Sequence, residues 1–463
     1  MNDLPYPHTG LRSTFRAAST GVKLILVGIL ALLMTIPAFF VSSLVDDRTR
    51  RERDVVNEIS SHVGGQQTFL GPILGIPYTI PAQGANDLTI HGLYLVFPAQ
   101  AIASIKSTTE ERHRSLFKVP VFQADLKLDA NFDLAGVPAS DPQGAQLDWP
   151  RAEFLVGVSD ARGALSDGSL TVDGKTTTLV PAALSPDMTF SAEQNDHLRL
   201  ILFGTSAVSV AQPGARFAVS SDLRFSGAQR LAILAYGKST RVSMLGDWRN
   251  PSFDGGFLPI SHTLVPNGFT AEWSIPFIAR GVRSEGPAET VSNLDATAFG
   301  VSFVEVADPY QSVNRSLKYV LLFLGLIFLS YFVFEVTSGK RVHPAQYVLI
   351  GVAQIIFYLL LLSFAERIGF DFAFLIAGSA TVLLLSLNAG WVFASRSEAR
   401  KAFVVFTLLY ALIYLLLRLE DNALLVGAIA SFMAVASAMY LTRRIDWYSS
   451  LPSGTSPPPA HEA

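Results

Sequence analysis

Residues 319–336 read YVLLFLGLIFLSYFVFEV, an apolar run long enough to cross a bilayer as one helix. Four more such runs follow, at 344–364, 372–393, 402–417 and 423–441. A sixth run, at 24–45, stands alone near the start. Between the lone run and the cluster, roughly 270 residues contain no apolar stretch of membrane length. The sequence therefore predicts six spanning helices, arranged as one plus five, around a large water-soluble domain.

The composition agrees with a membrane protein that also has an aqueous part. The 463 residues are 50% hydrophobic and 16% charged, with a mean hydropathy of +0.36. The net charge of -3 leaves no basic surface for a phosphate backbone, so no nucleic-acid partner is expected. The chain has no cysteine, which excludes disulfides, thiolate catalysis and cysteine-ligated metals.

The lone run predicts an uncleaved signal anchor. Residues 24–45 are too long for the apolar core of a signal peptide, and residues 42–44 make a poor cleavage site. The domain organisation expected from these boundaries has three further parts besides the spans. They are a cytoplasmic segment at 1–23, the β-rich domain at 46–318, and a disordered cytoplasmic tail at 442–463, rich in Pro and Ser near its end.

Lysine and arginine in the short loops predict the orientation, because basic loops stay in the cytoplasm. The basic loop residues that would share one side are Lys340, Arg341, Arg396, Arg400, Lys401, Arg443 and Arg444. The opposite loops are acidic or balanced, as at Glu366, Arg367 and Asp371. Four arginines between 48 and 53 disagree, but long domains translocate largely regardless of charge. Both termini are expected in the cytoplasm and the domain in the periplasm.

The middle region predicts short strands. Apolar and polar residues alternate from 122 to 133, as in a strand with one wet face. Asp173-Gly174 suits a type I′ hairpin turn, and Gly64-Gly65 should end a helix that continues the first span from residue 46. Further strand-like runs lie at 94–97, 154–158, 198–203, 217–225, 269–278 and 299–306. The fold class is thus α-helical membrane protein with an all-β, sandwich-like domain of one or two lobes.

Several stretches resemble the CreD family of inner-membrane proteins, from about Gly21 to Tyr448. The similarity is carried by 65–72 (GQQTFLGP), 246–248 (GDW), 268–273 (GFTAEW), 278–281 (IARG), 315–319 (RSLKY), 343–347 (HPAQY), 419–425 (LEDNALL) and 440–448 (YLTRRIDWY). The resemblance implies a bacterial inner-membrane protein linked to cell-envelope integrity and to the regulon of a two-component system. It implies no catalytic residue.

Polar residues within the spans are candidate functional or packing positions, because each is costly in lipid. Tyr347, Gln354 and Tyr358 share one face of the third span, Asn388 marks the fourth, and Glu335 lies near the end of the second. Hydrogen bonding between helices is the plainest interpretation, and the position of Glu335 near a span end suits an interface anchor. Arg443, Arg444, Trp447 and Tyr448 form a basic and aromatic group typical of anchors at the cytoplasmic interface.

Motifs for enzymatic chemistry are weak. Gly237-Lys238-Ser239-Thr240 matches only the end of a phosphate-binding loop, and no two histidines have the spacing of a helical zinc site. No catalytic residue, metal site or cofactor is therefore predicted. The leading hypothesis is a non-enzymatic protein of the bacterial inner membrane. Its domain would sense, bind or scaffold periplasmic envelope proteins, lipid or glycan, while the bilayer holds its helices. The alternative is a transporter or lipid-handling protein that the domain gates.

Overall fold

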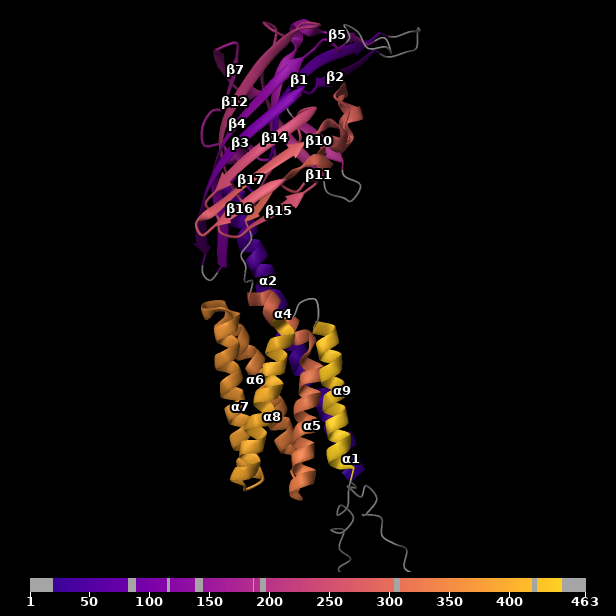
Figure 1. Cartoon of the computed structure of the whole chain (residues 1–463), viewed down its shortest axis with the longest axis vertical. Coiled ribbons are helices and arrows are strands. Elements are labelled where there is room, and N and C mark those ends of the chain that lie inside the picture. Colours follow the sequence, from indigo (N-terminus) through magenta and orange to yellow (C-terminus); the bar gives the residue numbers. More distant parts are fainter. Residues whose placement is uncertain are drawn as a thin grey trace, which may run out of the picture. The chain divides into compact units, whose positions relative to one another are not determined.

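The computed structural model describes residues 20–81, 89–114, 117–137, 145–185, 187–191, 197–303, 309–418 and 423–443. The chain divides into two compact units, Glu52–Val306 and the combination of Met1–Arg51 with Ala307–Ala463. Figure 1 shows the strands gathered in the first unit and a bundle of long helices in the second. Each unit is described by itself.

The predicted first span is a helix with one interruption. α1 (Thr20–Leu33) and α2 (Thr35–Val63) are separated only by Met34. Pro37 explains the break, because it has no N–H to donate to the carbonyl four residues earlier, at Leu33. α2 then continues to Val63, as expected, and Gly64 and Gly65 end it with positive φ angles of 94° and 61°.

The remaining long helices lie at the predicted apolar runs, and one short helix, Pro309–Lys318, precedes them. They are α4 (Pro309–Lys318), α5 (Val320–Ser338), α6 (Pro344–Ile368), α7 (Phe370–Val392), α8 (Arg396–Arg418) and α9 (Ala423–Thr442). Among the described residues, five helical segments are long and apolar enough to span a membrane: Val22–Val63 and α5 to α8. α9 contains a shorter apolar segment, Leu425–Ser437, so a sixth span stays a prediction. The short amphipathic helix α4 was not predicted.

The described residues of the β-rich unit form two sheets. The eleven-stranded sheet has a main path in the order β10 (Asp187–Ser191), β11 (His197–Ser206), β6 (Glu153–Val158), β1 (Gln67–Ile80), β13 (Arg230–Ile233), β19 (Phe299–Phe303) and β15 (Pro251–Gly255). Beside this path lie β2 (Ile90–Val96), β5 (Gln146–Leu147), β9 (Val180–Pro181) and β18 (Glu285–Pro287).

The eight-stranded sheet runs in the order β16 (Ser261–Val265), β17 (Gly268–Ile275), β14 (Ser239–Gly246), β3 (Gln100–Arg114), β4 (Phe117–Asp133), β12 (Arg216–Ala228), β7 (Ser169–Val172) and β8 (Lys175–Thr178). Most pairs are antiparallel, as expected. Two are parallel, β1 with β13 and β3 with β14. These pairs join segments far apart in sequence, which the alternation within single strands cannot indicate.

Both sheets share one hydrophobic core, so the unit is one sandwich and not two lobes. Phe132 on β4 packs against Phe154 on β6, with ring centroids 5.8 Å apart, and Phe225 on β12 packs against Phe69 on β1. The hydroxyl of Tyr236, which follows β13, donates toward the carbonyls of Ile102 and Asp129 in the other sheet at 3.0 Å each. Short one-turn or irregular helices complete the unit: η1 (Trp149–Arg151), η2 (Ala161–Gly163), η3 (Ala288–Thr297) and α3 (Phe277–Arg280).

Local predictions within the sandwich have clear outcomes. The Asp173-Gly174 turn joins β7 to β8 with positive φ at both residues, 48° and 75°, which confirms the hairpin. The run predicted as a strand from 269 to 278 is wrong at its end. Pro276 cannot donate a ladder hydrogen bond, so β17 stops at Ile275 and the helical turn α3 follows.

Candidate functional site

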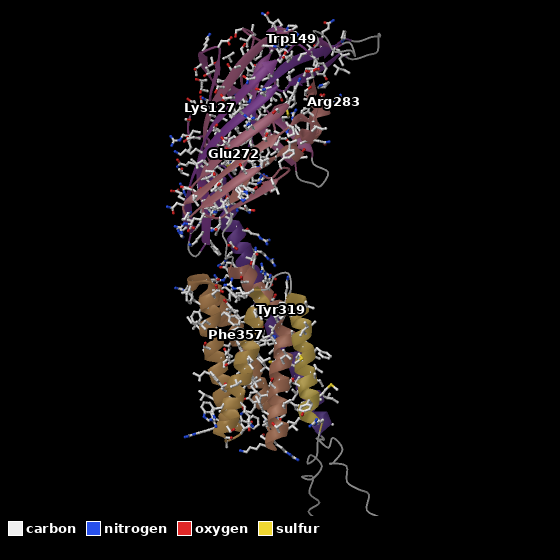
Figure 2. All side chains as sticks on the ribbon, viewed as in Figure 1. Lys127, Trp149, Glu272, Arg283, Tyr319 and Phe357 are labelled. Atoms are coloured by element: carbon white, nitrogen blue, oxygen red, sulfur yellow. The ribbon has the colours of Figure 1, made fainter. Side chains whose placement is uncertain are left out.

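The outward face of the eight-stranded sheet carries a groove of about 740 Å³. Five strands, β17, β14, β3, β4 and β12, build its floor, and their registers place outward side chains in rows. One row contains Glu272, Ser243, Ser104, Lys127 and Asp222, since each is the direct neighbour of the next across the sheet. Figure 2 labels Lys127 and Glu272 on this sheet. The composition of the groove is therefore set by the register of the strands, which places these side chains next to one another.

The groove mixes charges of both signs. Its charged side chains are Lys106, Lys127, Arg224, Asp125, Asp167, Asp222 and Glu272. Arg224 and Asp125 form an ion pair at 3.4 Å. Within the described part of the chain, neither Lys106 nor Lys127 forms an ion pair. Two ammonium groups are thus available to a partner, and none of the lining residues is aromatic.

Sequence reasoning missed a buried arginine beside the core of the sandwich. Arg280 is 3% exposed and stacks over the ring of Phe97 at 4.0 Å. Its Nε donates to the carbonyl of Ala235 at 2.8 Å, and Nη1 donates to the carbonyl of Arg283 at 3.3 Å. Nη2 has no hydrogen-bond partner among the described residues, and burial lowers the pKa of Arg280 to about 10. Arg280 lies in the motif at 278–281, but nothing in that motif shows that the Arg280 side chain points inward.

Glu335 has several polar contacts within the helical unit. Its side chain is buried, and its carboxylate forms an ion pair with the ammonium of Lys23 on α1. Glu335 Oε1 also accepts from the backbone N–H of Val342 at 3.0 Å, and Oε2 accepts from the hydroxyl of Tyr347 at 2.9 Å. Lys23 Nζ donates further to the carbonyl of Val342 at 2.7 Å. Glu335 is therefore an internal link between α1, α5 and α6.

The other predicted polar residues also face inward. Gln354 is fully buried and its Oε1 accepts from the hydroxyl of Tyr410 at 2.9 Å, joining α6 to α8. In the part of the chain that the structure describes, its Nε2 has no hydrogen-bond partner, and neither does the buried hydroxyl of Tyr358. Gln354 and Tyr358 thus share one face, as expected, but only the first forms a hydrogen bond between helices.

Asn388 joins a second polar contact between helices. Its Oδ1 accepts from the hydroxyl of Tyr331 on α5 at 2.5 Å, and its Nδ2 donates to the side-chain oxygen of Gln346 on α6 at 3.2 Å. Tyr331 and Gln346 were not predicted as partners. The available signal was that each of the three is a polar residue inside a predicted apolar run.

The predicted anchor group is only partly described. The guanidinium of Arg443 stacks over the ring of Tyr440 at 4.0 Å. Arg444, Trp447 and Tyr448 lie outside the described residues, as do the tail from 451 onward and most of the segment 1–23.

The described residues contain no group of three or more His, Asp or Glu side chains placed to hold a metal ion. The weak phosphate-loop motif lies in a tight turn instead. Thr240 Oγ1 accepts from the backbone N–H of Gly237 at 3.1 Å, and strand β14 begins at Ser239. A phosphate loop requires a helix at that point.

Comparison with known proteins identifies the family. A family model described as inner membrane protein CreD matches residues 19–448. The chain belongs to the CreD family. The protein described as inner membrane protein CreD from Escherichia coli (strain K12) is 28% identical over 433 residues, which cover 91% of this chain and 92% of that protein. The resemblance to CreD found in the sequence is confirmed, and with the long apolar helices it indicates a multi-pass inner-membrane protein.

Proposed function

We propose that this protein supports the integrity of the cell envelope as a non-enzymatic binding protein. In this proposal the β sandwich lies in the periplasm, both termini are cytoplasmic, and the groove on the eight-stranded sheet contacts a partner protein. The observation that carries the proposal is the groove itself, with Lys106 and Lys127 unpaired beside carboxylates and hydroxyls. Family membership supports the location in the inner membrane.

The chemistry of the groove favours a protein partner over a small ligand. Small-molecule pockets are mostly apolar and enclosed, with a few polar groups that fix orientation. This groove is charged across five strands and has no aromatic side chain in its lining. Charges of both signs in fixed rows favour a complementary protein surface, which they would orient and select.

Orientation rests on the basic loops. Lys340 and Arg341 follow α5, while Arg396 and its neighbours begin α8. Alternation of the helices places these loops at one end of the bundle, and basic short loops are retained in the cytoplasm. We expect an alkaline-phosphatase fusion near Asp173 to be active and one near Arg396 to be inactive. The reverse pattern would overturn the periplasmic placement.

The groove is tested by cross-linking in intact membranes. A photoreactive amino acid at Ser243, in the middle of the groove, should capture the same partner in repeated experiments. The matched control is Thr177, which is exposed on the edge strand β8 and lies outside the groove. The captured band should weaken when Lys106→Glu and Lys127→Glu are combined with the probe at Ser243. Equal capture at Ser243 and Thr177 would count against the groove as the contact surface.

A complementation assay connects the groove to the envelope. We expect the Lys106→Glu/Lys127→Glu protein to fail in restoring detergent tolerance to cells that lack the gene. Lys175→Glu, at the exposed start of β8, should restore it because this lysine lies outside the groove. Full rescue by the double variant would contradict the proposal, provided both proteins reach the membrane in equal amounts.

A further inference from the structure

A second cavity lies in the helical unit, between α7 and α8. It has a volume of about 540 Å³, within the range of roughly 300–1,000 Å³ that ligand pockets occupy. Its walls include Phe372, Leu375 and Phe403, which are 66%, 64% and 48% exposed. Figure 1 shows α7 and α8 as neighbouring helices of the bundle. The cavity is therefore an apolar crevice that opens on the surface of the bundle.

The length of the crevice corresponds to one leaflet of a bilayer. On α7 its lining runs from Asp371 to Val382, and on α8 from Phe403 to Tyr414. Eleven residues of helix rise by about 16 Å at about 1.5 Å per residue. The hydrocarbon core of a bilayer is about 30 Å thick, so half of it is about 15 Å. The crevice is therefore about as long as one leaflet of the hydrocarbon core is thick.

One end of the crevice is lined by Asp371, and Arg418, which is not itself a lining residue, pairs with that carboxylate. Asp371, at the start of α7, forms an ion pair with Arg418, at the end of α8. The hydroxyl of Tyr414 donates to Asp371 Oδ1 at 3.1 Å, and Arg418 Nε donates to Tyr414 at 3.4 Å. The side chains of Asp371 and Arg418 remain 50% and 56% exposed. A guanidinium has five N–H donors and a carboxylate about four acceptor sites, so both retain capacity for a ligand.

We propose that this crevice binds one zwitterionic phospholipid with an ethanolamine head group. An acyl chain would lie between α7 and α8, the phosphate would contact Arg418, and the ammonium would contact Asp371. The charge pair of Asp371 and Arg418 complements a head group that carries the same two charges in reverse. A head group with phosphate alone leaves the carboxylate of Asp371 facing a negative charge. This site does not depend on the proposed function of the β sandwich.

The experiment compares lipids on the purified full-length protein. After delipidation in detergent, binding of phosphatidylethanolamine and phosphatidylglycerol with identical chains is measured by native mass spectrometry. We expect a preference of roughly fivefold for phosphatidylethanolamine, which corresponds to one added charge-assisted contact. Asp371→Asn should reduce that preference to near one while acyl-chain binding persists.

Filling the crevice tests the position of the chain. Ala411→Phe and Ser379→Phe each place a ring in the crevice, one from α8 and one from α7, and each should reduce lipid retention several-fold. Leu384→Phe is the matched control, because Leu384 is exposed on α7 but does not line the crevice. Thermal unfolding in detergent verifies that each variant folds, and two filling variants guard against the failure of one.

Three results would overturn the proposal. Equal retention of the two lipids by the unaltered protein would remove the role of the head group. Undiminished retention by a folded filling variant would remove the crevice as the site. A lipid-free dimer whose subunits cross-link through photoreactive amino acids placed at Phe372 or Leu375 would show that a second copy covers the crevice.

Discussion

The ammonium of Lys23, in the first helix, forms an ion pair with the carboxylate of Glu335, 312 residues later along the chain. This pair joins the isolated first helix to the helical cluster that follows the β sandwich. Lys23 is 21% exposed and Glu335 is 7% exposed at the side chain, so water screens the pair only in part. Removing one partner leaves a charge in surroundings that cannot solvate it fully.

Lys23→Met should therefore destabilise the helical unit by about 3 kcal/mol, the lower end of the cost of breaking a buried pair. Arg112→Met is the control, since Arg112 pairs with Glu110 at 2.8 Å but the two side chains are 50% and 61% exposed, and its loss should cost less than about 1 kcal/mol. Both are measured by thermal unfolding in detergent. Adding Glu335→Gln to Lys23→Met should recover part of the loss; purely additive costs would show that the two residues are not coupled.

Two buried tyrosines near Gln354 should respond differently to the loss of a hydroxyl. Tyr410→Phe removes the hydrogen bond to Gln354 Oε1 and should cost about 0.6–1.7 kcal/mol, as for other hydrogen bonds between membrane helices. Tyr358→Phe should be neutral or stabilising, because the Tyr358 hydroxyl is buried with no partner. Equilibrium unfolding of the two variants checks the difference. Equal costs would mean that Tyr358 has a partner after all.

Gly71 must remain glycine because of Tyr236. A Cβ added at Gly71 would lie 2.5 Å from atoms of the Tyr236 ring, which is fully buried between the sheets. Gly71→Ala should destabilise the sandwich by about 1–3 kcal/mol. Gly136→Ala is the control, because nothing lies within 4 Å of its added Cβ. If circular dichroism melts of both variants coincide, the close approach of Gly71 and Tyr236 is not present in solution.

Asp160 should contribute to the acid sensitivity of the sandwich. A hydrogen bond from the Arg162 side chain holds the pKa of Asp160 below its usual value, despite partial burial, and the Arg162 backbone N–H adds a bond of 2.9 Å. A carboxyl group whose pKa is lower in the folded state stabilises the fold when the pH is above its unfolded pKa, about 3.9. This contribution is lost as the pH falls through the folded pKa. Asp160→Asn should therefore destabilise at pH 7 more than at pH 3.

Unfolding of the full-length protein at the two pH values measures this difference. Asp125→Asn is a suitable comparison, because Asp125 is 67% exposed at its side chain and its ion pair with Arg224 should contribute little. An equal effect of Asp160→Asn at both pH values would mean that its carboxylate stabilises the fold without titrating in that range.

The sequence predicted the local structure of this protein far better than its sites. Runs of apolar residues located α5 to α8. A segment in lipid must form all its backbone hydrogen bonds internally, so it is a long apolar helix that can be recognised from its composition. The turn at Asp173-Gly174 was equally visible, since its residues favour positive φ. Pro276 ends β17 because it has no N–H to donate to the neighbouring strand, although the prediction extended the strand beyond it.

The groove could not be predicted because it depends on which strands are neighbours. Lys127 on β4 lies beside Ser104 on β3 and Asp222 on β12, positions that are far apart along the chain. Each residue alone is an ordinary polar residue on the wet face of a strand. The crevice between α7 and α8 is similar, because Asp371 and Arg418 face each other only after these two helices pack.

The sequence by itself determined the separation of one apolar run from five others, the β character of the region between them, and the family. These properties are visible locally, since hydrophobicity, alternation and turn residues act over a few positions. Only the tertiary structure decided that Lys23 pairs with Glu335, that both sheets share one core, and which polar residues line the groove and the crevice. The physical reason is that these contacts depend on strand register and helix packing, which join residues that are distant in the chain.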